Sequence, residues 1–230
     1  MLDKIPNSIG LIPDGNRRWA RKHNIQFFEA YKLGVKKVVD FSEWCSSFGV
    51  KHLAVWALST ENIKNRTRRE LLDLFTLYYN VANDRDIINR LHNNKTRFIV
   101  VGHKDLLPKR LVEALNNVER ETKRYKDRFL YMMLGYGGRD DILFAVKNMI
   151  KDKINKINEH SFRRYLISSV LPDIDLIIRT SGEKRLSGFI PWQGGYSELY
   201  FSNKLWPDFS KSDLEKALID YSERDRRFGK

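Results

Sequence analysis

The stretch RTSGEKRLSGFIPWQGGYSELYF, residues 179–201, decides how the rest of the chain is interpreted. It follows the apolar run Leu176-Ile177-Ile178, which is typical of a buried strand. Arginines, hydroxyl side chains and glycines come directly after that strand. Guanidinium groups bind phosphate oxygens in bidentate fashion, and backbone N–H groups freed by glycine add further donors. A solvated charged loop would share this composition, but the aromatic residues Trp192, Tyr196 and Tyr200 favour an anion-binding site.

Outward from this stretch, length and composition predict one domain over residues 1–230. The chain has 42% hydrophobic residues, which is ordinary for a globular protein. It contains no apolar run of the roughly 18–20 residues that a membrane span needs, and its first residues lack a signal-peptide core. The single cysteine, Cys45, excludes a disulfide framework and favours a reducing cytoplasm.

The formal net charge of +13 calls for an anionic partner. Nucleic acid, an acidic membrane surface and phosphorylated substrates would each satisfy it. Composition does not separate these classes, whereas the positions of the arginines do. They gather at strand ends beside an aspartate rather than along an exposed basic helix, so we expect no nucleic acid partner.

Strand and helix patterns alternate along the chain, which predicts an α/β domain with a mostly parallel sheet surrounded by helices. The strands are expected at residues 8–13, 52–58, 96–101, 129–134 and 176–178. The helices are expected at 29–48, 69–93, 108–125, 140–154 and 160–166 and from 210 onward. The helix at 69–93 is more apolar and aromatic than one core-facing side requires.

Polar groups also follow the first two predicted strands. Asp14-Gly15-Asn16 precedes the helical RRWARK, and Ser59-Thr60-Glu61-Asn62 ends the strand at 52–58. Parallel sheets place ligands at the carboxyl ends of their strands, so these groups could share one cleft with the 179–201 loop. Asp14 would repel a phosphate unless a cation such as Mg²⁺ bridged the two; its alternative role is a helix N-cap. The 59–62 cluster has the same alternative, a cap or turn.

These groups suit chemistry in which diphosphate leaves an apolar substrate. No serine–histidine–acid or cysteine–histidine arrangement is evident, which disfavours covalent catalysis. Arginines and Mg²⁺ would neutralise the charge that develops on the leaving group.

Three ordered motifs make the prediction specific: IPDGNRRWARK at 12–22, LSTENIKNR at 58–66, and the 179–201 stretch. Together they resemble the cis-prenyltransferases, the undecaprenyl and dehydrodolichyl diphosphate synthase family, from about Ile9 to Gly229. Arg17-Arg18 resembles the archaeal and eukaryotic branch. The resemblance implies about six strands ringed by helices, a hydrophobic tunnel with residues 69–93 in its wall, and a homodimer. It implies condensation of an allylic isoprenoid diphosphate with isopentenyl diphosphate to a Z-configured polyprenyl diphosphate.

The resemblance also implies roles for individual residues. Asp14 would bind Mg²⁺ and assist departure of the allylic diphosphate. Glu198 would supply a second metal ligand, either within the same chain or from the partner subunit of the dimer. Ser59, Glu61 and Asn62 would line the reacting centre, with Asn62 helping to remove the proton. The residues expected to bind substrate are Gly15, Asn16, Arg18, Phe27 and Tyr31 on the allylic side, Arg179, Arg185 and Ser187 for isopentenyl diphosphate, and Arg17, Trp19 and Arg66 with no side assigned.

Several positions depart from the family pattern. Phe27 stands where an arginine is usual and Tyr31 where a histidine is usual, so two expected ligands of the allylic diphosphate are missing. Ile63 replaces an aromatic residue, and Asn65 precedes Arg66 where arginine and proline are expected. Regular elongation, irregular coupling with dimethylallyl diphosphate and a non-catalytic partner subunit therefore remain open, with Lys32 a candidate to compensate for the lost charge.

For the surroundings of the protein, we expect a cytoplasmic homodimer that touches the inner face of a membrane only peripherally. This follows from the absence of a span, the excess positive charge and a lipidic product. The basic tail RDRRFGK at 224–230 resembles the family segment that reaches the partner's active site; its alternative is a simple charged end.

Overall fold

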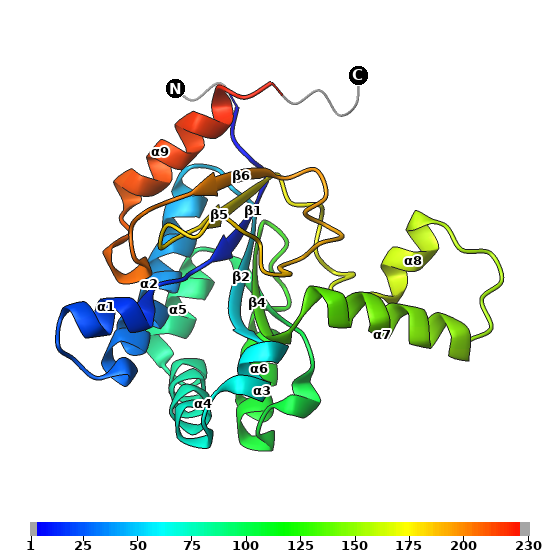
Figure 1. Ribbon diagram of the computed structural model, residues 1–230, viewed down its shortest axis with the longest axis horizontal. Coiled ribbons are helices and arrows are strands. Elements are labelled where there is room, and N and C mark those ends of the chain that lie inside the picture. Colours follow the sequence, from blue (N-terminus) through cyan, green and yellow to red (C-terminus); the bar gives the residue numbers. More distant parts are fainter. Residues whose placement is uncertain (1–3, 226–230) are drawn as a thin grey trace.

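The computed structural model describes residues 4–225, in which a six-stranded sheet forms the centre (Figure 1). All neighbouring strands are parallel and their order is β3-β4-β2-β1-β5-β6. The strands are β1 Ser8–Ile12, β2 His52–Ser59, β3 Thr96–Val101, β4 Arg128–Tyr136, β5 Leu176–Arg179 and β6 Glu198–Phe201. The helices are α1 Asn16–Lys22, α2 Phe27–Ser47, α3 Thr60–Asn65, α4 Arg68–Ala82, α5 Arg85–Asn93, α6 Lys109–Thr122, α7 Gly138–Lys151, α8 Glu159–Tyr165 and α9 Lys211–Ser222, with 3₁₀ turns η1 Lys104–Leu106 and η2 Trp206–Asp208.

In the strand order, β2, β4 and β3 lie on one side of β1, and β5 and β6 lie on the other side. Gly10 of β1 is in register with Ala54 of β2 on one side and with Ile177 of β5 on the other. The loops that follow β1, β2 and β5 therefore leave the sheet at the same edge, side by side. In open parallel sheets this switch point is where ligands bind.

The two faces of the sheet are covered differently. Ile9 and Leu11 of β1 point into a large core closed by α2, α4, α5, α6 and α9. The opposite face is closed by loop segments that bring Leu171, Phe189 and Ile190 onto the strands. Gly10 allows this close packing, since a Cβ there would lie 2.9 Å from a carbon of the Phe189 ring. The short apolar strands are buried on both faces, as expected for a parallel sheet.

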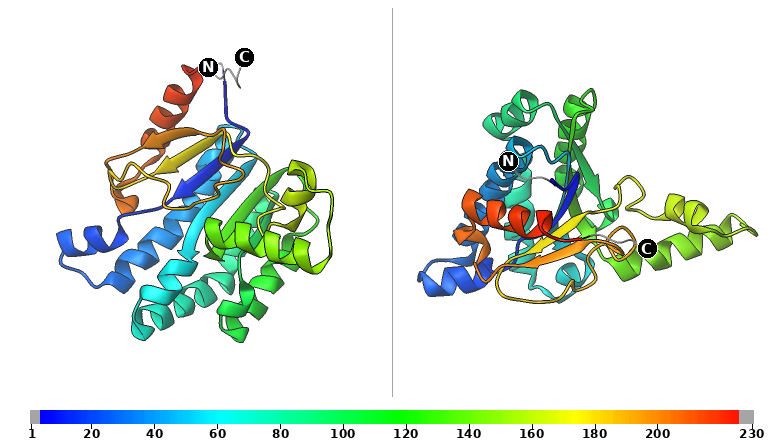
Figure 2. Two further views of the ribbon diagram at one scale, coloured as in Figure 1. Left: turned by 45° about the vertical axis from the view of Figure 1, so that its right-hand side comes forward. Right: turned by 90° about the horizontal axis from the view of Figure 1, so that it is seen from above.

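Helices α7 and α8 extend away from the rest of the molecule as an arm (Figures 1 and 2). The arm is anchored at its base by the buried Asp141 carboxylate, which accepts hydrogen bonds from Tyr136 Oη (3.1 Å), the Ile167 N–H (2.6 Å) and Ser168 Oγ. Burial raises the pKa of Asp141, although these donors oppose the shift. The arm exposes large apolar side chains: Leu143, Phe144, Val146, Ile150 and Ile157.

The predicted α/β domain with a parallel sheet is confirmed, and the sheet proves to be entirely parallel. The single helix predicted at 69–93 is wrong, because the chain forms α4 and α5 instead. Asp84 lies between the two helices and is the N-cap of α5. Its Oδ1 accepts hydrogen bonds from the N–H groups of Asp86 and Ile87. The helix predicted from residue 210 is α9, whereas residues 226–230 of the basic tail lie outside the described residues. None of the helices within residues 4–225 is both long and apolar enough to cross a bilayer.

Candidate active site

A cavity of about 1220 Å³ opens at the edge where the loops after β1, β2 and β5 meet. Most of the residues singled out in the sequence line it: Asp14, Gly15, Asn16, Arg17, Arg18, Tyr31, Ser59, Glu61, Asn62, Arg66, Arg179, Arg185 and Ser187. Segments nearly the whole chain length apart therefore form one pocket, as the parallel-sheet argument predicts.

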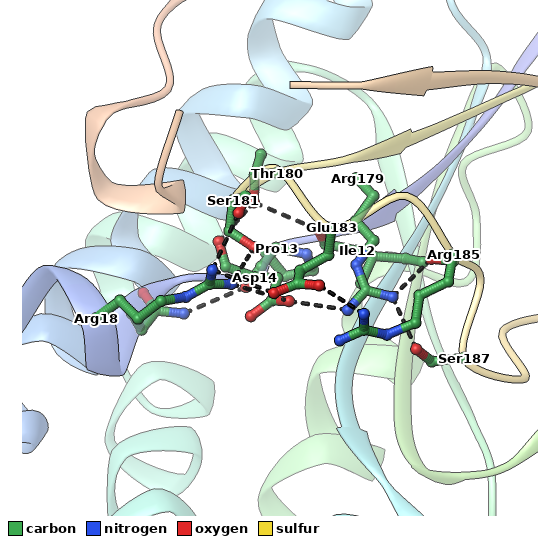
Figure 3. Close-up of polar contacts among 11 residues, drawn as sticks. Ile12, Pro13, Asp14, Arg18, Arg179, Thr180, Ser181, Glu183, Arg185 and Ser187 are labelled. Carbon is green, nitrogen blue, oxygen red and sulfur yellow. Dashed lines mark hydrogen bonds and ion pairs between the residues drawn. The ribbon is translucent and has the colours of Figure 1, made fainter. Parts of the chain in front are cut away.

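Asp14 is the centre of a paired charge cluster in this pocket (Figure 3). Its Oδ2 accepts a hydrogen bond of 2.9 Å from Arg179 Nη2 and lies 3.6 Å from Arg18 Nη2. Glu183 bridges a second pair of guanidiniums, 3.2 Å from Arg18 Nη1 and 2.5 Å from Arg185 Nη1. The arginines expected to hold two different diphosphates are thus joined through two carboxylates.

Arg179 is fixed by its position at the end of β5 and by the loop that follows. Its side chain is 6% exposed, and Nη1 donates to Ser187 Oγ (2.8 Å) and to the Arg185 carbonyl (2.6 Å). Arg18 crosses from α1 to the same loop, where Nη1 donates to the Ser181 carbonyl at 3.1 Å. Ser181 and Ser187 have positive φ angles of 80° and 53°, so the loop turns sharply at both residues. These turns accompany the contacts of the loop with the Arg179 guanidinium. The polar side of the pocket is therefore pre-organised.

The turn before α1 places Asp14 in the pocket rather than at a helix cap. The N-cap is Gly15, which has φ 111° and makes no side-chain cap, so the N-cap alternative for Asp14 is wrong. Glycine is required there because left-handed φ angles strain residues that carry a Cβ. Asn16 donates to the Pro13 carbonyl at 3.3 Å, while its Oδ1 is buried without a partner among residues 4–225.

Ser59 is the N-cap of α3, which is the cap role that the sequence offered as the alternative to a role at the reacting centre. Its Oγ accepts from the Asn62 N–H at 2.9 Å, which satisfies one of the free donors of that helix. The cap also sets Glu61 and Asn62 in the first turn, where both line the pocket. Ser59 therefore positions the cluster even where its hydroxyl contacts no substrate.

The deeper side of the pocket is apolar. It is lined by Val35 and Val38 of α2, Val55 and Ala57 of β2, Tyr78 of α4 and Met132 of β4. Tyr78 is buried and its Oη donates to the Ala57 carbonyl at 2.9 Å, and this burial raises the pKa of Tyr78 far above its usual value. Behind it lies a small apolar cavity of about 40 Å³.

Val35, Tyr78 and Met132 line both this small cavity and the main pocket, so they form the partition between them.

Three predicted site residues lie outside the pocket. Trp19 donates to Asp208 at 2.6 Å from its indole Nε1 and stacks on His23. Phe27 is 37% exposed and lies outside the lining. Glu198 pairs in the sheet with Leu176, at the amino end of β5, far along the strand from Arg179.

The Glu198 carboxylate contacts Arg224 at 2.7 Å. A metal site shared by Asp14 and Glu198 of one chain is therefore not formed, and a contribution across a dimer stays a prediction.

Several lining residues were not predicted. Arg21 belongs to the quoted RRWARK motif, and Arg139 follows β4 as the other site residues follow their strands, so both had a signal in the sequence. Glu183 lies within the 179–201 loop. Trp56 had no such signal, because it sits inside β2, where its indole donates to the Tyr136 carbonyl at 3.1 Å. Among residues 4–225, the cationic side chains of the lining are all arginines: Arg17, Arg18, Arg21, Arg66, Arg139, Arg179 and Arg185.

The donor set limits what metal the pocket could hold. Residues 4–225 contain no group of three or more histidine, cysteine, aspartate or glutamate side chains suited to a metal ion. Asp14 makes its contacts to arginine through Oδ2, which leaves Oδ1 available in the pocket. One carboxylate oxygen fits Mg²⁺, which commonly takes one or two carboxylates together with substrate phosphate oxygens.

Comparison with known proteins bears directly on this site. Residues 12–229 match the family described as "Putative undecaprenyl diphosphate synthase". The chain is 44% identical to the geranylgeranyl-diphosphate-specific tritrans,polycis-undecaprenyl-diphosphate synthase of Methanopyrus kandleri, over 99% of this chain and 86% of the relative. It is 40% identical to the isoprenyl transferase of Aquifex aeolicus, over 99% and 97%.

A solved structure is also similar over nearly its whole length. It is the lavandulyl diphosphate synthase of Lavandula x intermedia in complex with dimethylallyl diphosphate. The two share a TM-score of 0.92 and 33% identity, over 98% of this chain and 99% of that one.

Proposed function

The chain belongs to the undecaprenyl diphosphate synthase family of cis-prenyltransferases, and we propose that it condenses an allylic isoprenoid diphosphate with isopentenyl diphosphate. The product is a Z-configured polyprenyl diphosphate, and diphosphate is released. The observation that carries this proposal is the Asp14–Arg179 ion pair, which joins the loops after β1 and β5 beside an apolar pocket wall. An isoprenoid diphosphate carries both a diphosphate and a hydrocarbon tail, so its site needs a charged region and an apolar wall within one cavity.

The two substrates would take opposite ends of the arginine cluster. Gly15, Asn16 and Arg18 at the start of α1 hold the allylic diphosphate, and Arg66 lines the same pocket. Arg179, Arg185 and Ser187 hold the diphosphate of isopentenyl diphosphate; Arg179 already donates to Ser187 and to the Arg185 backbone. The apolar tail extends between α2 and α4, toward Tyr78.

In the reaction, the bond between C1 of the allylic substrate and its diphosphate oxygen breaks, and the diphosphate leaves with the electron pair. C4 of isopentenyl diphosphate bonds to C1, and a proton is lost from C2 to the departing diphosphate. Arg18 acts on the charge that develops on the leaving group, which is where a fixed cation lowers a barrier most. Asn62, held at the start of α3 by the Ser59 cap, directs the proton.

Mg²⁺ is the proposed cofactor, and the Asp14 carboxylate would hold it. When bound, it neutralises charge on the leaving diphosphate. The chain's own part is to present a carboxylate whose orientation is fixed by Arg179 at 2.9 Å.

Coupling with dimethylallyl diphosphate is the second candidate, favoured by the likeness to a synthase solved with that compound and by Phe27 and Tyr31. Incubation with labelled isopentenyl diphosphate and a panel of allylic diphosphates, followed by product analysis, separates the two. Z-polyprenyl products from farnesyl or geranylgeranyl diphosphate would exclude the second candidate. A branched product from dimethylallyl diphosphate alone would exclude the first, and no product from any pair would leave only a non-catalytic partner subunit.

We also propose an oligomeric state and a cellular location for the protein from its membership of this family. A homodimer would cover the apolar side chains of the α7–α8 arm, such as Ile150, which is 72% exposed. The protein would work in the cytoplasm and touch the inner face of a membrane peripherally, since its product is a lipid. Mass measurement in solution tests the dimer, and a monomer at working concentrations would contradict it.

A further inference from the structure

The pocket arginines divide into two groups by their partners. Arg18, Arg179 and Arg185 are paired with Asp14 or Glu183, and Arg17 lies 3.9 Å from Glu70. Arg21, Arg66 and Arg139 make no ion pair within the described part of the chain. A guanidinium that lines a cleft without a carboxylate partner keeps its full charge available for an anionic ligand.

Arg21 and Arg66 share a second feature, an aromatic ring beneath the guanidinium. Arg21 lies 5.8 Å from the centre of the Phe27 ring, and Arg66 lies 5.2 Å from that of Tyr31. Phe27 and Tyr31 are four residues apart on α2, so their rings are neighbours on one face of the helix. The two guanidiniums therefore stand over adjacent rings at the same side of the pocket.

Their donors are also left without acceptors. Arg66 Nε is buried and has no hydrogen-bond partner among residues 4–225. Arg21 comes from the last turn of α1, one turn beyond Arg17 and Arg18, and makes no side-chain hydrogen bond there either. This matters most for Arg66 Nε, because a buried donor without an acceptor costs free energy unless a ligand supplies one, whereas the exposed Arg21 is open to solvent.

We infer that Arg21, together with Arg66, forms a clamp for the diphosphate of the allylic substrate, and that Phe27 is a positioning residue that supports Arg21. The inference rests on the proposed function. It gives the two unusual aromatic residues a role. Phe27 supports Arg21 of α1, and Tyr31 supports Arg66 at the end of α3. Lys32, the compensating cation considered from the sequence, does not line the pocket.

The clamp is assigned to the allylic side by its position. Arg21 shares α1 with Arg18 and Asn16, whereas Arg185 and Ser187 reach the pocket from the loop after β5. Between the two lies Asp14, paired with Arg179. A diphosphate held by Arg21 would therefore lie on the α1 side of Asp14, away from the loop after β5 that carries Arg185 and Ser187.

Lys22 provides a matched control for the test. It is the next residue of α1, carries the same charge, is exposed and does not line the pocket. We expect Arg21→Ala to weaken farnesyl diphosphate binding, measured by calorimetry, about tenfold, and to raise its KM equally. The KM for isopentenyl diphosphate should stay unchanged, and Lys22→Ala should leave both values within about twofold. Equal effects of Arg21→Ala and Lys22→Ala would overturn the clamp.

Phe27→Leu tests the support. This variant keeps an apolar side chain but removes the aromatic face, and we expect it to weaken allylic binding about threefold. In the Arg21→Ala background the same change should have no further effect on binding, because Phe27 acts through Arg21. An equal loss in both backgrounds would show a merely structural role, and thermal unfolding of each variant identifies a general loss of stability.

Inorganic diphosphate separates this inference from the proposed function. If the unaltered protein forms no product with any isoprenoid diphosphate, the proposed function fails. Calorimetric titration with inorganic diphosphate still decides the clamp, since we expect binding to depend on Arg21 and not on Lys22. Binding that is the same in Arg21→Ala as in the unaltered protein would overturn the inference alone.

Discussion

The two sides of the pocket are built on different physical terms. On the side of α1 and the loop after β5, Asp14, Arg18, Arg179 and Glu183 are held by ion pairs between 2.9 and 3.6 Å long. On the side of α2 and α4, the lining is mostly apolar, and a hydrogen bond from Tyr78 to the Ala57 carbonyl holds the partition in place.

Charged contacts are directional and depend strongly on distance, whereas apolar contacts depend on shape and volume. The comparison predicts that changes on the first side alter rate and substrate affinity. Changes on the second side should alter which product is made.

The largest effect should come from Asp14. We expect Asp14→Ala to lower kcat about 100- to 1000-fold, because the variant loses the proposed metal ligand and leaves Arg179 without its partner. EDTA should abolish activity of the unaltered protein, and added Mg²⁺ should restore it. Circular dichroism of the variant should show an intact fold, since Asp14 caps no helix. Full activity in EDTA or in the variant would contradict the metal role.

Arg185→Ala should affect one substrate only. Loss of a charge-assisted contact should raise the KM for isopentenyl diphosphate about 10- to 100-fold, with the allylic KM little changed. Lys184→Ala is the matched control, since Lys184 is an exposed neighbour outside the pocket lining. An unchanged KM for isopentenyl diphosphate in Arg185→Ala would remove this assignment.

Tyr78 tests the apolar side. Tyr78→Ala would open the partition toward the cavity of about 40 Å³ behind it, so we expect longer products rather than a loss of catalysis. Tyr78→Phe keeps the ring and removes only the hydrogen bond to Ala57, which should cost about 1 kcal/mol of stability without changing product length. Chromatography of the dephosphorylated products measures the length. Identical distributions from all three proteins would break the proposed division of roles.

The smallest effect should come from Ser59, which lies between the two sides. Ser59→Ala should lower the free energy of unfolding by about 1 kcal/mol through loss of the α3 cap. Ser59→Asn retains a capping side chain and should recover most of that stability. Denaturant unfolding gives the stability. A loss of activity that persists in Ser59→Asn would assign the hydroxyl itself to the reaction.

Much of the site could be predicted from the sequence, because its residues follow strands. Asp14, Ser59 and Arg179 each come at the end of a short apolar run, and a parallel sheet brings such ends together. The break between α4 and α5 also had a signal, since Asp84 is a good N-cap residue, but the continuing apolar pattern concealed it.

Other features depend on tertiary contacts that no local pattern encodes. Phe27 and Tyr31 gave no sign that they would lie beneath Arg21 and Arg66, which are distant in the sequence or on another helix. β6 has only intermediate burial, so neither alternation nor an apolar run identified it as a strand. Glu198, at its first residue, was therefore placed by resemblance alone, at the wrong end of the sheet for a site with Asp14 of the same chain.

The exclusive use of arginine in the pocket has a consequence for how this protein responds to chemistry in the cell and in the test tube. Acetylation, and reagents that form imines, act on the amine of lysine, so they find no target among the lining residues of the described part of the chain, 4–225. Guanidinium groups also remain protonated throughout the physiological range. The attraction of this pocket for anions is therefore a permanent property of the chain, and dicarbonyl reagents directed at arginine are the covalent probes to which it is open.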